Sequence, residues 1–296
     1  MRKIIFKGAC SALITPMSAE GIDYPALKKL IEAQIEGGID AIVIGGTTGE
    51  AATLTERERA ELFRFCADKI GGRVKFMLGV GSNDTADVLK RVRLANSLSP
   101  DGILVVTPYY NKGTRGGIIE HYRRIADESR SPVMLYNVPQ RTGVCLSLED
   151  LEILSDEENI VAIKEASDSA DRYTHIASLF PKIALYAGCD SQIYSTLALG
   201  GLGVVSVVSN LFPKKISALC KAFFDGDAER ARDLQLSLLP FIDAMFRECN
   251  PAPIKYAMSL YSLCENRLRL PLSSVSDTTK REIEEKISLL NGDSFA

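Results

Sequence analysis

The chain has 296 residues, 46% of them hydrophobic and 25% charged, and its formal net charge is −3. This composition is typical of a globular protein with a large core. The 35 basic residues are spread along the chain, which argues against a nucleic-acid-binding surface. No stretch approaches the roughly 20 apolar residues of a membrane span.

The seven cysteines favour a reducing compartment. Their number is odd and no two form a CxxC pair, which argues against a disulfide framework and against a zinc site. We therefore expect free, mostly buried thiols, no metal, and a cytoplasmic protein. The apolar N-terminus superficially resembles a signal peptide, but Lys7 interrupts it and Thr15-Pro16 follows where the apolar stretch should continue.

In chain order, eight short apolar runs alternate with stretches of helical periodicity. The runs are rich in Val, Ile and Leu, as buried parallel strands are, and cover residues 9–14, 41–44, 75–79, 102–106, 133–136, 160–163, 183–186 and 203–207. The predicted helices between them cover residues 24–36, 55–69, 85–98, 117–129, 147–154 and 170–180. Good capping residues, such as Thr55 with Glu58, support several helix starts.

This alternation predicts an α/β protein with a (β/α)8 (TIM) barrel. An open doubly wound sheet is the alternative, but its usual GxGxxG turn is absent after the first strand. From residue 227 onward only helical patterns remain, at residues 228–245, 253–264 and 278–290. We therefore predict a catalytic barrel over residues 1–226 and a small C-terminal helical domain over residues 227–296.

Barrel enzymes carry their catalytic groups at the C-terminal ends of the strands. Lys164 ends the sixth strand directly after four apolar residues, and such burial favours a nucleophilic amine. The alternative is a structural lysine that reaches the rim or pairs with Glu165. Tyr136 ends the fifth strand and Arg141 follows it, so a proton-relaying phenol and a carboxylate clamp are candidates beside the lysine.

The second strand runs into Gly45-Gly46-Thr47-Thr48-Gly49-Glu50, whose amides and hydroxyls suit an anion; a plain tight turn is the alternative. Tyr109 and Tyr110 follow the fourth strand, and two adjacent tyrosines of this kind often only pack at an interface. The only histidines, His121 and His175, fall within predicted helices, and we expect both on helix surfaces. Without HExxH or GxSxG, a zinc hydrolase and a serine triad are disfavoured.

Five segments at predicted strand ends carry a resemblance to a known family. GTTGEAATL, TPYYNK, YNVPQRTG, IKEAS and GGLGVVSV occur in this order, and NPAPIK and LRLPL follow in the tail. From about Gly8 to Leu272 the chain resembles the dihydrodipicolinate synthase family, within the N-acetylneuraminate lyase superfamily. The resemblance implies a lyase of diaminopimelate and lysine biosynthesis that condenses pyruvate with L-aspartate 4-semialdehyde, without a metal, as a homotetramer built from tight dimers.

The resemblance also implies residue roles. Lys164 would form an imine with pyruvate, and Thr47, Tyr136 and a Tyr110 from the neighbouring subunit would relay protons. Thr47 and Thr48 would hold the pyruvate carboxylate, Arg141 would hold the second substrate, and Gly188 and Val205 would line the pocket. Positions that match a lysine-effector site in inhibited relatives are Ala51, Ala52, Glu56, Arg59, Asn83, Asp87 and Tyr109.

Two departures from the family pattern stand out. Cys189-Asp190 replaces an acidic pair after the seventh strand, which puts the local packing in doubt. Arg59 replaces a histidine, and its charge should repel an incoming ammonium group, so we predict weak or absent inhibition by L-lysine.

Two other functions remain open on the sequence. A relative that keeps the pyruvate imine, such as N-acetylneuraminate lyase or a 2-keto-3-deoxy sugar acid aldolase, would use another aldehyde; Arg141 favours a small carboxylated one. A non-catalytic barrel that binds a keto acid would need none of the predicted relay residues.

Overall fold

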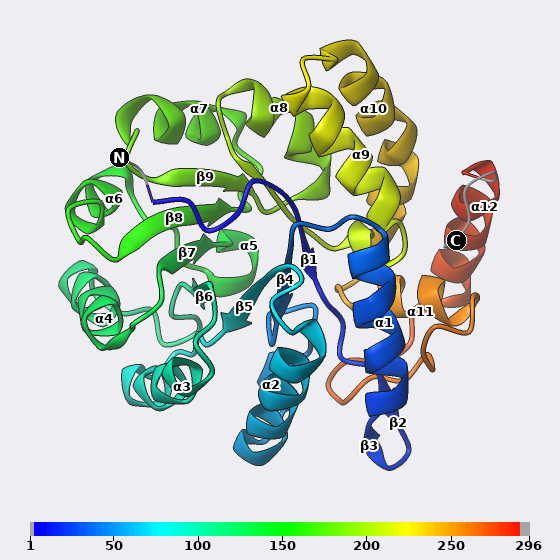
Figure 1. Cartoon of the computed structure of the whole chain (residues 1–296), viewed down its shortest axis with the longest axis horizontal. Helices are drawn as coiled ribbons and strands as arrows, with labels where there is room; N and C mark the ends of the chain where they lie inside the picture. The colour runs from blue at the N-terminus through cyan, green and yellow to red at the C-terminus, as the bar shows by residue number, and fades with distance from the viewer. Residues whose placement is uncertain (1–2, 291–296) are drawn as a thin grey trace.

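Eight parallel strands close into a barrel in the order β1-β10-β9-β8-β7-β6-β5-β4, which confirms the predicted fold. A computed structural model describes residues 3–290 of the chain (Figure 1). The barrel strands are β1 (Gly8–Ala12), β4 (Ala41–Ile44), β5 (Lys75–Gly79), β6 (Gly102–Val106), β7 (Val133–Asn137), β8 (Ile160–Glu165), β9 (Ala184–Ala187) and β10 (Gly203–Ser206). A short antiparallel hairpin of β2 (Met17–Ser18) and β3 (Gly21–Ile22), which the periodicity did not indicate, precedes the first helix.

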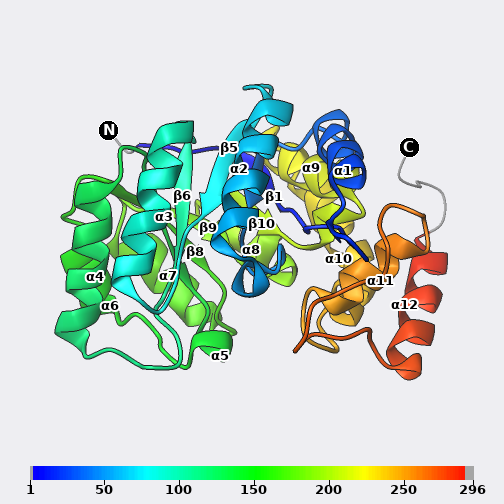
Figure 2. The same cartoon turned by 90° about the horizontal axis from the view of Figure 1, so that it is seen from below.

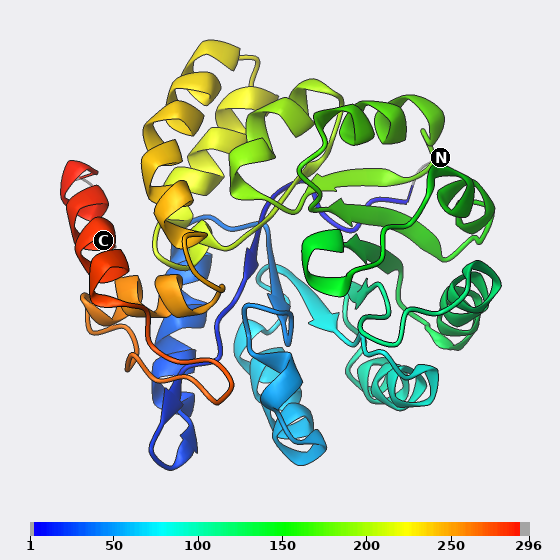
Figure 3. The ribbon, with the colours of Figure 1, turned by 180° about the vertical axis from the view of Figure 1, so that it is seen from behind.

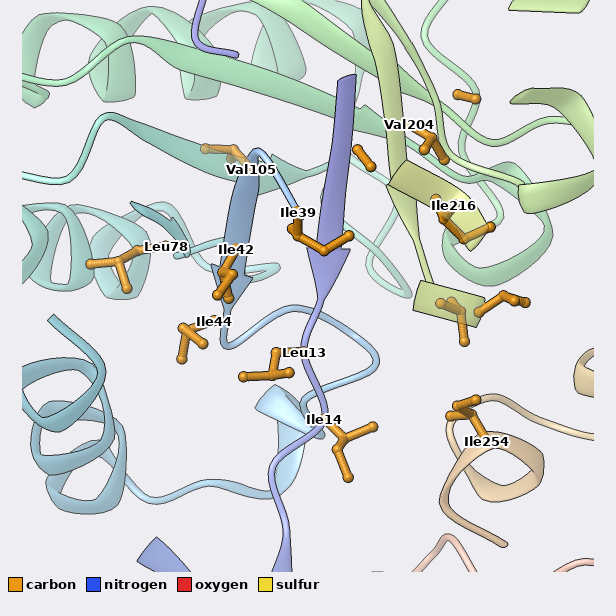
Figure 4. Close-up of a cluster of buried hydrophobic side chains, with 14 of the residues drawn as sticks. Leu13, Ile14, Ile39, Ile42, Ile44, Leu78, Val105, Val204, Ile216 and Ile254 are labelled. Carbon is orange, nitrogen blue, oxygen red and sulfur yellow. The ribbon is translucent and has the colours of Figure 1, made fainter. Parts of the chain in front are cut away.

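The strands bury both of their faces, because alternate side chains point into the barrel and out toward the helices. On β7, Met134 and Tyr136 belong to the cluster inside the barrel, whereas Leu135 belongs to the cluster under the helices. Figure 4 shows part of this outer cluster, with Ile42, Leu78 and other strand residues among its members. Burial on both faces explains why the runs read as continuously apolar rather than alternating.

The helices that surround the barrel form where the periodicity predicted them. They are α1 (Tyr24–Glu36), α2 (Glu56–Ile70), α3 (Thr85–Leu98), α4 (Arg115–Glu128), α6 (Leu148–Leu154) and α7 (Ala170–Leu179). The Thr55–Glu58 capping box is formed at the start of α2. Three further helices were not predicted: α5 (Pro139–Thr142), α8 (Ile193–Ala198) and α9 (Pro213–Phe224).

The tail consists of α10 (Ala228–Met245), α11 (Ala252–Ser259) and α12 (Asp277–Leu289), as the sequence predicted. Figures 2 and 3 show these helices along one side of the barrel, beyond α9 and beside α1. Ile254 of α11 and Ile283 of α12 belong to the same buried cluster as the outer barrel residues. The division at residue 227 stays a prediction, and residues 1–2 and 291–296 of the predicted ranges lie outside the described part.

The cysteine side chains are free thiols in the described part of the chain. Cys10, Cys66, Cys220 and Cys264 are buried, as expected for most of them, whereas Cys145 and Cys249 are exposed. No helix within residues 3–290 is both long and apolar enough to cross a membrane.

The two histidines differ in their surroundings. His175 is exposed on α7, as expected, but the prediction for His121 was wrong, because its ring is buried between α4 and α3. Nδ1 of His121 lies 2.9 Å from the hydroxyl of Thr85, and its Nε2 has no hydrogen-bond partner among the described residues. Burial, only partly countered by Asp84, lowers the pKa of His121 to about 4. A buried histidine on a mostly apolar helix face is not distinguishable by spacing from an exposed one.

We expect His121 to make the fold sensitive to acid. As the pH falls from 6.5 toward 4, the unfolded chain binds a proton at His121 before the folded one does. The free energy of unfolding should then fall by roughly 2–3 kcal/mol over this window and level off below it. Thermal melts at several pH values should show a flatter profile for His121→Gln than for the wild type. His175→Gln is the matched control on an exposed helix face, and identical profiles for all three proteins would contradict the prediction.

Candidate active site

A cavity of about 420 Å³ opens at the C-terminal ends of the strands. Its walls come from the segments that follow β4, β6 and β7, and from the tail. The polar or aromatic residues among those that line it include Thr47, Glu50, Arg59, Arg91, Tyr109, Tyr136, Arg141 and Asn250. The structure thus brings Thr47, Tyr136 and Arg141, three of the predicted site residues, to one cavity.

Lys164 lies inside the barrel directly beside Tyr136. The two residues are paired in register on the adjacent strands β8 and β7. The Nζ of Lys164 is 4.2 Å from the centroid of the Tyr136 ring, and the lysine is only 5% exposed. Within residues 3–290, Lys164 forms no ion pair. A buried amine without a carboxylate partner is unusual for a structural lysine.

Glu165, the predicted alternative partner of Lys164, is engaged elsewhere. Its carboxylate accepts hydrogen bonds from Nδ2 of Asn137 at 2.9 Å, from the amide of Ser167 at 2.9 Å and from Nε of Arg172 at 2.8 Å. Because successive residues of a strand face opposite sides, Glu165 points away from the barrel interior that Lys164 occupies. The pairing of Lys164 with Glu165 is therefore excluded, and the two neighbours have separate surroundings.

The charge of Lys164 affects the pKa values of two other groups in the barrel, Cys10 and Asp190. Burial raises the pKa of Cys10, and the nearby Lys164 opposes this shift. Burial likewise raises the pKa of the Asp190 carboxyl, whereas its hydrogen bonds and Lys164 lower it. Asp190 accepts hydrogen bonds from Ser206 Oγ and from the amide of Val207. Although Cys189-Asp190 departs from the family pattern, the turn is ordered here, because both carboxylate oxygens of Asp190 accept hydrogen bonds.

The loop after β4 carries the two threonines into different positions. Thr47 lines the cavity and is partly exposed, whereas Thr48 is buried beside it. Oγ1 of Thr48 accepts a hydrogen bond from Nδ2 of Asn250, at 3.0 Å. Glu50 ends the turn in the left-handed conformation, with φ of 54°. The glycines around the threonines let the chain turn tightly at the mouth of the barrel.

Arg141 on α5 is held by the tail. Its Nη2 donates to the backbone oxygen of Asn250 at 3.1 Å, and its Nη1 donates to Sγ of Cys249 at 3.6 Å. No carboxylate within residues 3–290 pairs with Arg141. A guanidinium that is fixed by neutral acceptors, at the wall of a cavity, can bind an incoming carboxylate.

A buried ion pair joins the loop after β4 to the tail. Lys255 of α11 donates to the carboxylate of Glu50, and both side chains are completely buried. The other oxygen of Glu50 accepts from the amide of Arg269 at 3.1 Å, and Lys255 also donates to the backbone oxygen of Arg267. Burial lowers the pKa of Lys255, and Glu50 opposes that shift.

Asn250, Glu50 and Lys255 were not predicted as site residues. The segment NPAPIK, which begins at Asn250, carried part of the family resemblance in the tail and was the available signal. Its relation to Thr48 could not be found from spacing, because about 200 residues separate the two positions.

Five predicted site residues are not among those that line the cavity: Lys164 and Thr48, described above, and Val205, Gly188 and Tyr110. Val205 belongs to the inner barrel cluster that contains Tyr136. The amide of Gly188 donates to the backbone oxygen of Glu165, and a Cβ at this glycine would lie 2.6 Å from that oxygen. Only glycine fits this approach of β9 to β8. Tyr110 is 88% exposed, has φ of 71° and does not line the cavity of its own chain.

The predicted effector residues are divided between the cavity and its surroundings. Ala51, Ala52, Arg59 and Tyr109 line the cavity, whereas Glu56, Asn83 and Asp87 do not. Arg59 is 1% exposed, and its Nη2 donates to the backbone oxygen of Ala51 at 2.7 Å. Burial, together with the neighbouring Arg91, lowers the pKa of Arg59, and Glu56 opposes this shift.

Metal ligands are not gathered anywhere in residues 3–290, since no three His, Cys, Asp or Glu side chains are grouped to hold an ion.

A (β/α)8 barrel with a buried lysine at the end of the sixth strand, next to a tyrosine and an unpaired arginine, has the arrangement of an imine-forming aldolase. Residues 5–290 match the model of the dihydrodipicolinate synthetase family. The chain therefore belongs to the dihydrodipicolinate synthetase family, as the resemblance implied.

The sequences of individual relatives align with this chain over nearly its full length. The chain is 43% identical to the 4-hydroxy-tetrahydrodipicolinate synthase of Alkaliphilus oremlandii, with 97% of this chain and 99% of that one covered. It is 44% identical to the enzyme of the same name from Acetivibrio thermocellus, with 94% of each covered. Among solved structures, dihydrodipicolinate synthase from Aquifex aeolicus has a TM-score of 0.93 at 37% identity, covering 97% and 98% of the two chains. The enzyme from Cyanidioschyzon merolae with lysine bound has a TM-score of 0.92 at 35% identity, covering 97% and 99%.

We expect Lys255→Met to destabilise the protein strongly. It leaves the Glu50 carboxylate buried without its partner, which should lower the free energy of unfolding by about 3–5 kcal/mol. The double variant Glu50→Gln, Lys255→Met should recover part of this loss. Lys280→Met, which breaks the surface pair with Asp277, should cost about 1 kcal/mol or less. Equal effects of Lys255→Met and Lys280→Met in denaturant unfolding would contradict the structural role of the buried pair.

Proposed function

We propose that this chain condenses pyruvate with L-aspartate 4-semialdehyde to 4-hydroxy-tetrahydrodipicolinate, through an imine on Lys164. The family to which the chain belongs is one of enzymes, and the chain is a lyase of the pyruvate-dependent aldolase class. The relatives that carry the synthase name support this reaction over the sugar acid aldolases. The observation that carries the proposal is the amine of Lys164, buried beside Tyr136 and free of any carboxylate partner in residues 3–290.

The first half of the reaction belongs to Lys164. Its neutral amine attacks the keto carbon of pyruvate, and the keto oxygen leaves as water after proton transfer, so that a C=N bond replaces the C=O bond. The imine draws electrons from the adjacent methyl group, which then loses a proton to give an enamine. The enamine carbon forms the new C–C bond with the aldehyde carbon of the second substrate, whose oxygen takes up a proton. The amino group of the second substrate then attacks the imine carbon, which closes the ring as a new C=N bond and displaces the Lys164 amine. One water has left in all, and no external oxidant or reductant is needed.

The proton transfers require groups that can both donate and accept. Tyr136 and Thr47 line one cavity, and the phenol ring of Tyr136 contacts Lys164, so both are suited to relay protons at the amine. We assign the third relay position to Tyr110 of a neighbouring subunit. Tyr110 is 88% exposed and does not line the cavity of its own chain, so its side chain is accessible to another chain.

The two substrates each present a carboxylate. We assign that of pyruvate to the Thr47–Thr48 loop and that of the second substrate to Arg141. A fixed guanidinium at the wall orients the aldehyde toward the enamine, which reduces the entropic cost of bringing both reactants together. The family resemblance further leads us to propose a homotetramer built from tight dimers, and the free cysteines favour a cytoplasmic setting.

Reductive trapping tests the proposed chemistry directly. Borohydride should reduce the imine of pyruvate to a stable secondary amine, and peptide mass mapping should locate it on Lys164. Lys164→Ala should lose both the adduct and the activity while keeping a normal melting temperature, whereas the exposed Lys182→Ala should retain both. Assays of pyruvate with aspartate semialdehyde, N-acetylmannosamine and sugar-derived aldehydes then separate the synthase from the aldolases. A wild-type protein that binds pyruvate but forms no adduct would be a non-catalytic keto-acid receptor.

We expect L-lysine to inhibit this enzyme weakly or not at all. The guanidinium of Arg59 already donates to the Ala51 oxygen and lies 3.5 Å from a carboxylate oxygen of Glu56, so a second cation would meet repulsion there. Steady-state assays with increasing L-lysine check this, and Arg59→His should become more sensitive. Arg57→His, on an exposed part of the same helix, is the matched control. Half-inhibition of the wild type at submillimolar L-lysine would contradict the prediction.

A further inference from the structure

The segment Cys249–Asn250 of the tail forms part of the cavity wall, next to the loop after β4. It joins α10 to α11 and is therefore not part of the barrel. It nevertheless contacts the two groups that the proposed function assigns to the two substrate carboxylates, Thr48 and Arg141. Asn250 is the residue that bonds both of them: its side chain bonds Thr48 and its backbone oxygen bonds Arg141.

The side chain of Asn250 determines which role the Thr48 hydroxyl can take. A threonine hydroxyl has a single proton and can also accept hydrogen bonds. Because Oγ1 of Thr48 accepts from Nδ2 of Asn250 at 3.0 Å, its proton remains available for another acceptor. No hydrogen bond donated by this hydroxyl is made to residues 3–290. The hydroxyl is thus kept as a donor, the role that a bound carboxylate requires.

The main chain of Asn250 holds the second group. Its carbonyl oxygen accepts a hydrogen bond from Nη2 of Arg141 at 3.1 Å, and Sγ of Cys249 accepts one from Nη1. Neutral acceptors fix the guanidinium without neutralising its charge, which leaves it able to bind an anion. This contact depends on the backbone and not on the side chain of residue 250.

Asn250 is well placed to act on both groups because it is itself immobilised. It is 5% exposed, and α11, which follows it, is tied to the loop after β4 by the buried pair of Lys255 and Glu50. Only Gly49 separates Thr48 from Glu50, so the same short loop receives both the Asn250 hydrogen bond and the ion pair. A rigid contact of this kind keeps a fixed distance between the two groups.

We propose that Asn250 is a positioning residue that sets the two carboxylate subsites relative to each other, its side chain acting on pyruvate through Thr48 and its carbonyl on the second substrate through Arg141. This inference rests on the proposed function. It assigns a substrate-ordering role to a residue of the helical tail.

A double-mutant cycle with Thr48 tests the proposal. Asn250→Ala should raise the pyruvate concentration that gives half-maximal borohydride trapping by about tenfold, as expected for a lost hydrogen bond that orients a donor to a charged group. In the Thr48→Val background, Asn250→Ala should add less than about a twofold further change. The KM for aspartate semialdehyde should stay within about threefold of the wild type, because the carbonyl is retained. A merely structural role would give additive effects and would raise both constants together.

Two more variants complete the experiment. Asn250→Asp keeps the shape of the side chain but loses the donor, so its effect on pyruvate should be at least as large as that of Asn250→Ala. Asn266→Ala removes another tail asparagine, whose Nδ2 bonds Ser274 away from the cavity, and should leave trapping unchanged. Additive effects in the cycle, or unchanged trapping in Asn250→Asp, would overturn the proposal. Absence of an adduct in the wild type would instead overturn the proposed function.

Discussion

The side-by-side placement of Lys164 and Tyr136 is the constraint on which the rest of the site depends. Two adjacent strands of a closed barrel are in register at these positions, so their side chains enter the same interior. Closure leaves no edge along which a strand could slip, and a shift by one residue would exchange Lys164 for Glu165. The bonds of Glu165 to Asn137 and Arg172 on the outer side oppose such a shift. The position of the amine is therefore fixed by packing on both faces of β8.

The cavity is completed by chain segments that the barrel does not supply. Thr48 and Arg141 lie on loops that follow β4 and β7, where a barrel fold commonly carries function. Both loops are anchored to the start of α11 through Asn250, and the first also through the pair of Glu50 and Lys255. Loops held in this way lose much of the conformational freedom that substrate binding would otherwise have to remove. The tail thus contributes order to the site as well as buried surface to the core.

Much of this arrangement could be predicted from the sequence. Strand positions follow from apolar runs that are buried on both faces, and the end of such a run marks Lys164, Tyr136 and Thr47 as neighbours at one rim. The contacts of Asn250 and Lys255 could not be predicted, because a partner about 200 residues away leaves no periodic trace. His121 was misplaced for a related reason: the pattern of a helix face does not reveal whether a single polar residue on it is covered by the next helix. The short helices α5 and α8 have too few turns to produce a clear period.

The buried pair of Glu50 and Lys255 has a consequence for how such proteins can be recombined. A chimaera that joins the barrel of one homologue to the tail of another will retain both charges only where the two parents share this pair at matching positions. If one parent has uncharged residues at these two positions, the hybrid will bury a single charge without its partner, at the substrate-binding loop. Crossover points near residue 227 are therefore compatible only between parents that carry matching residues at positions 50 and 255.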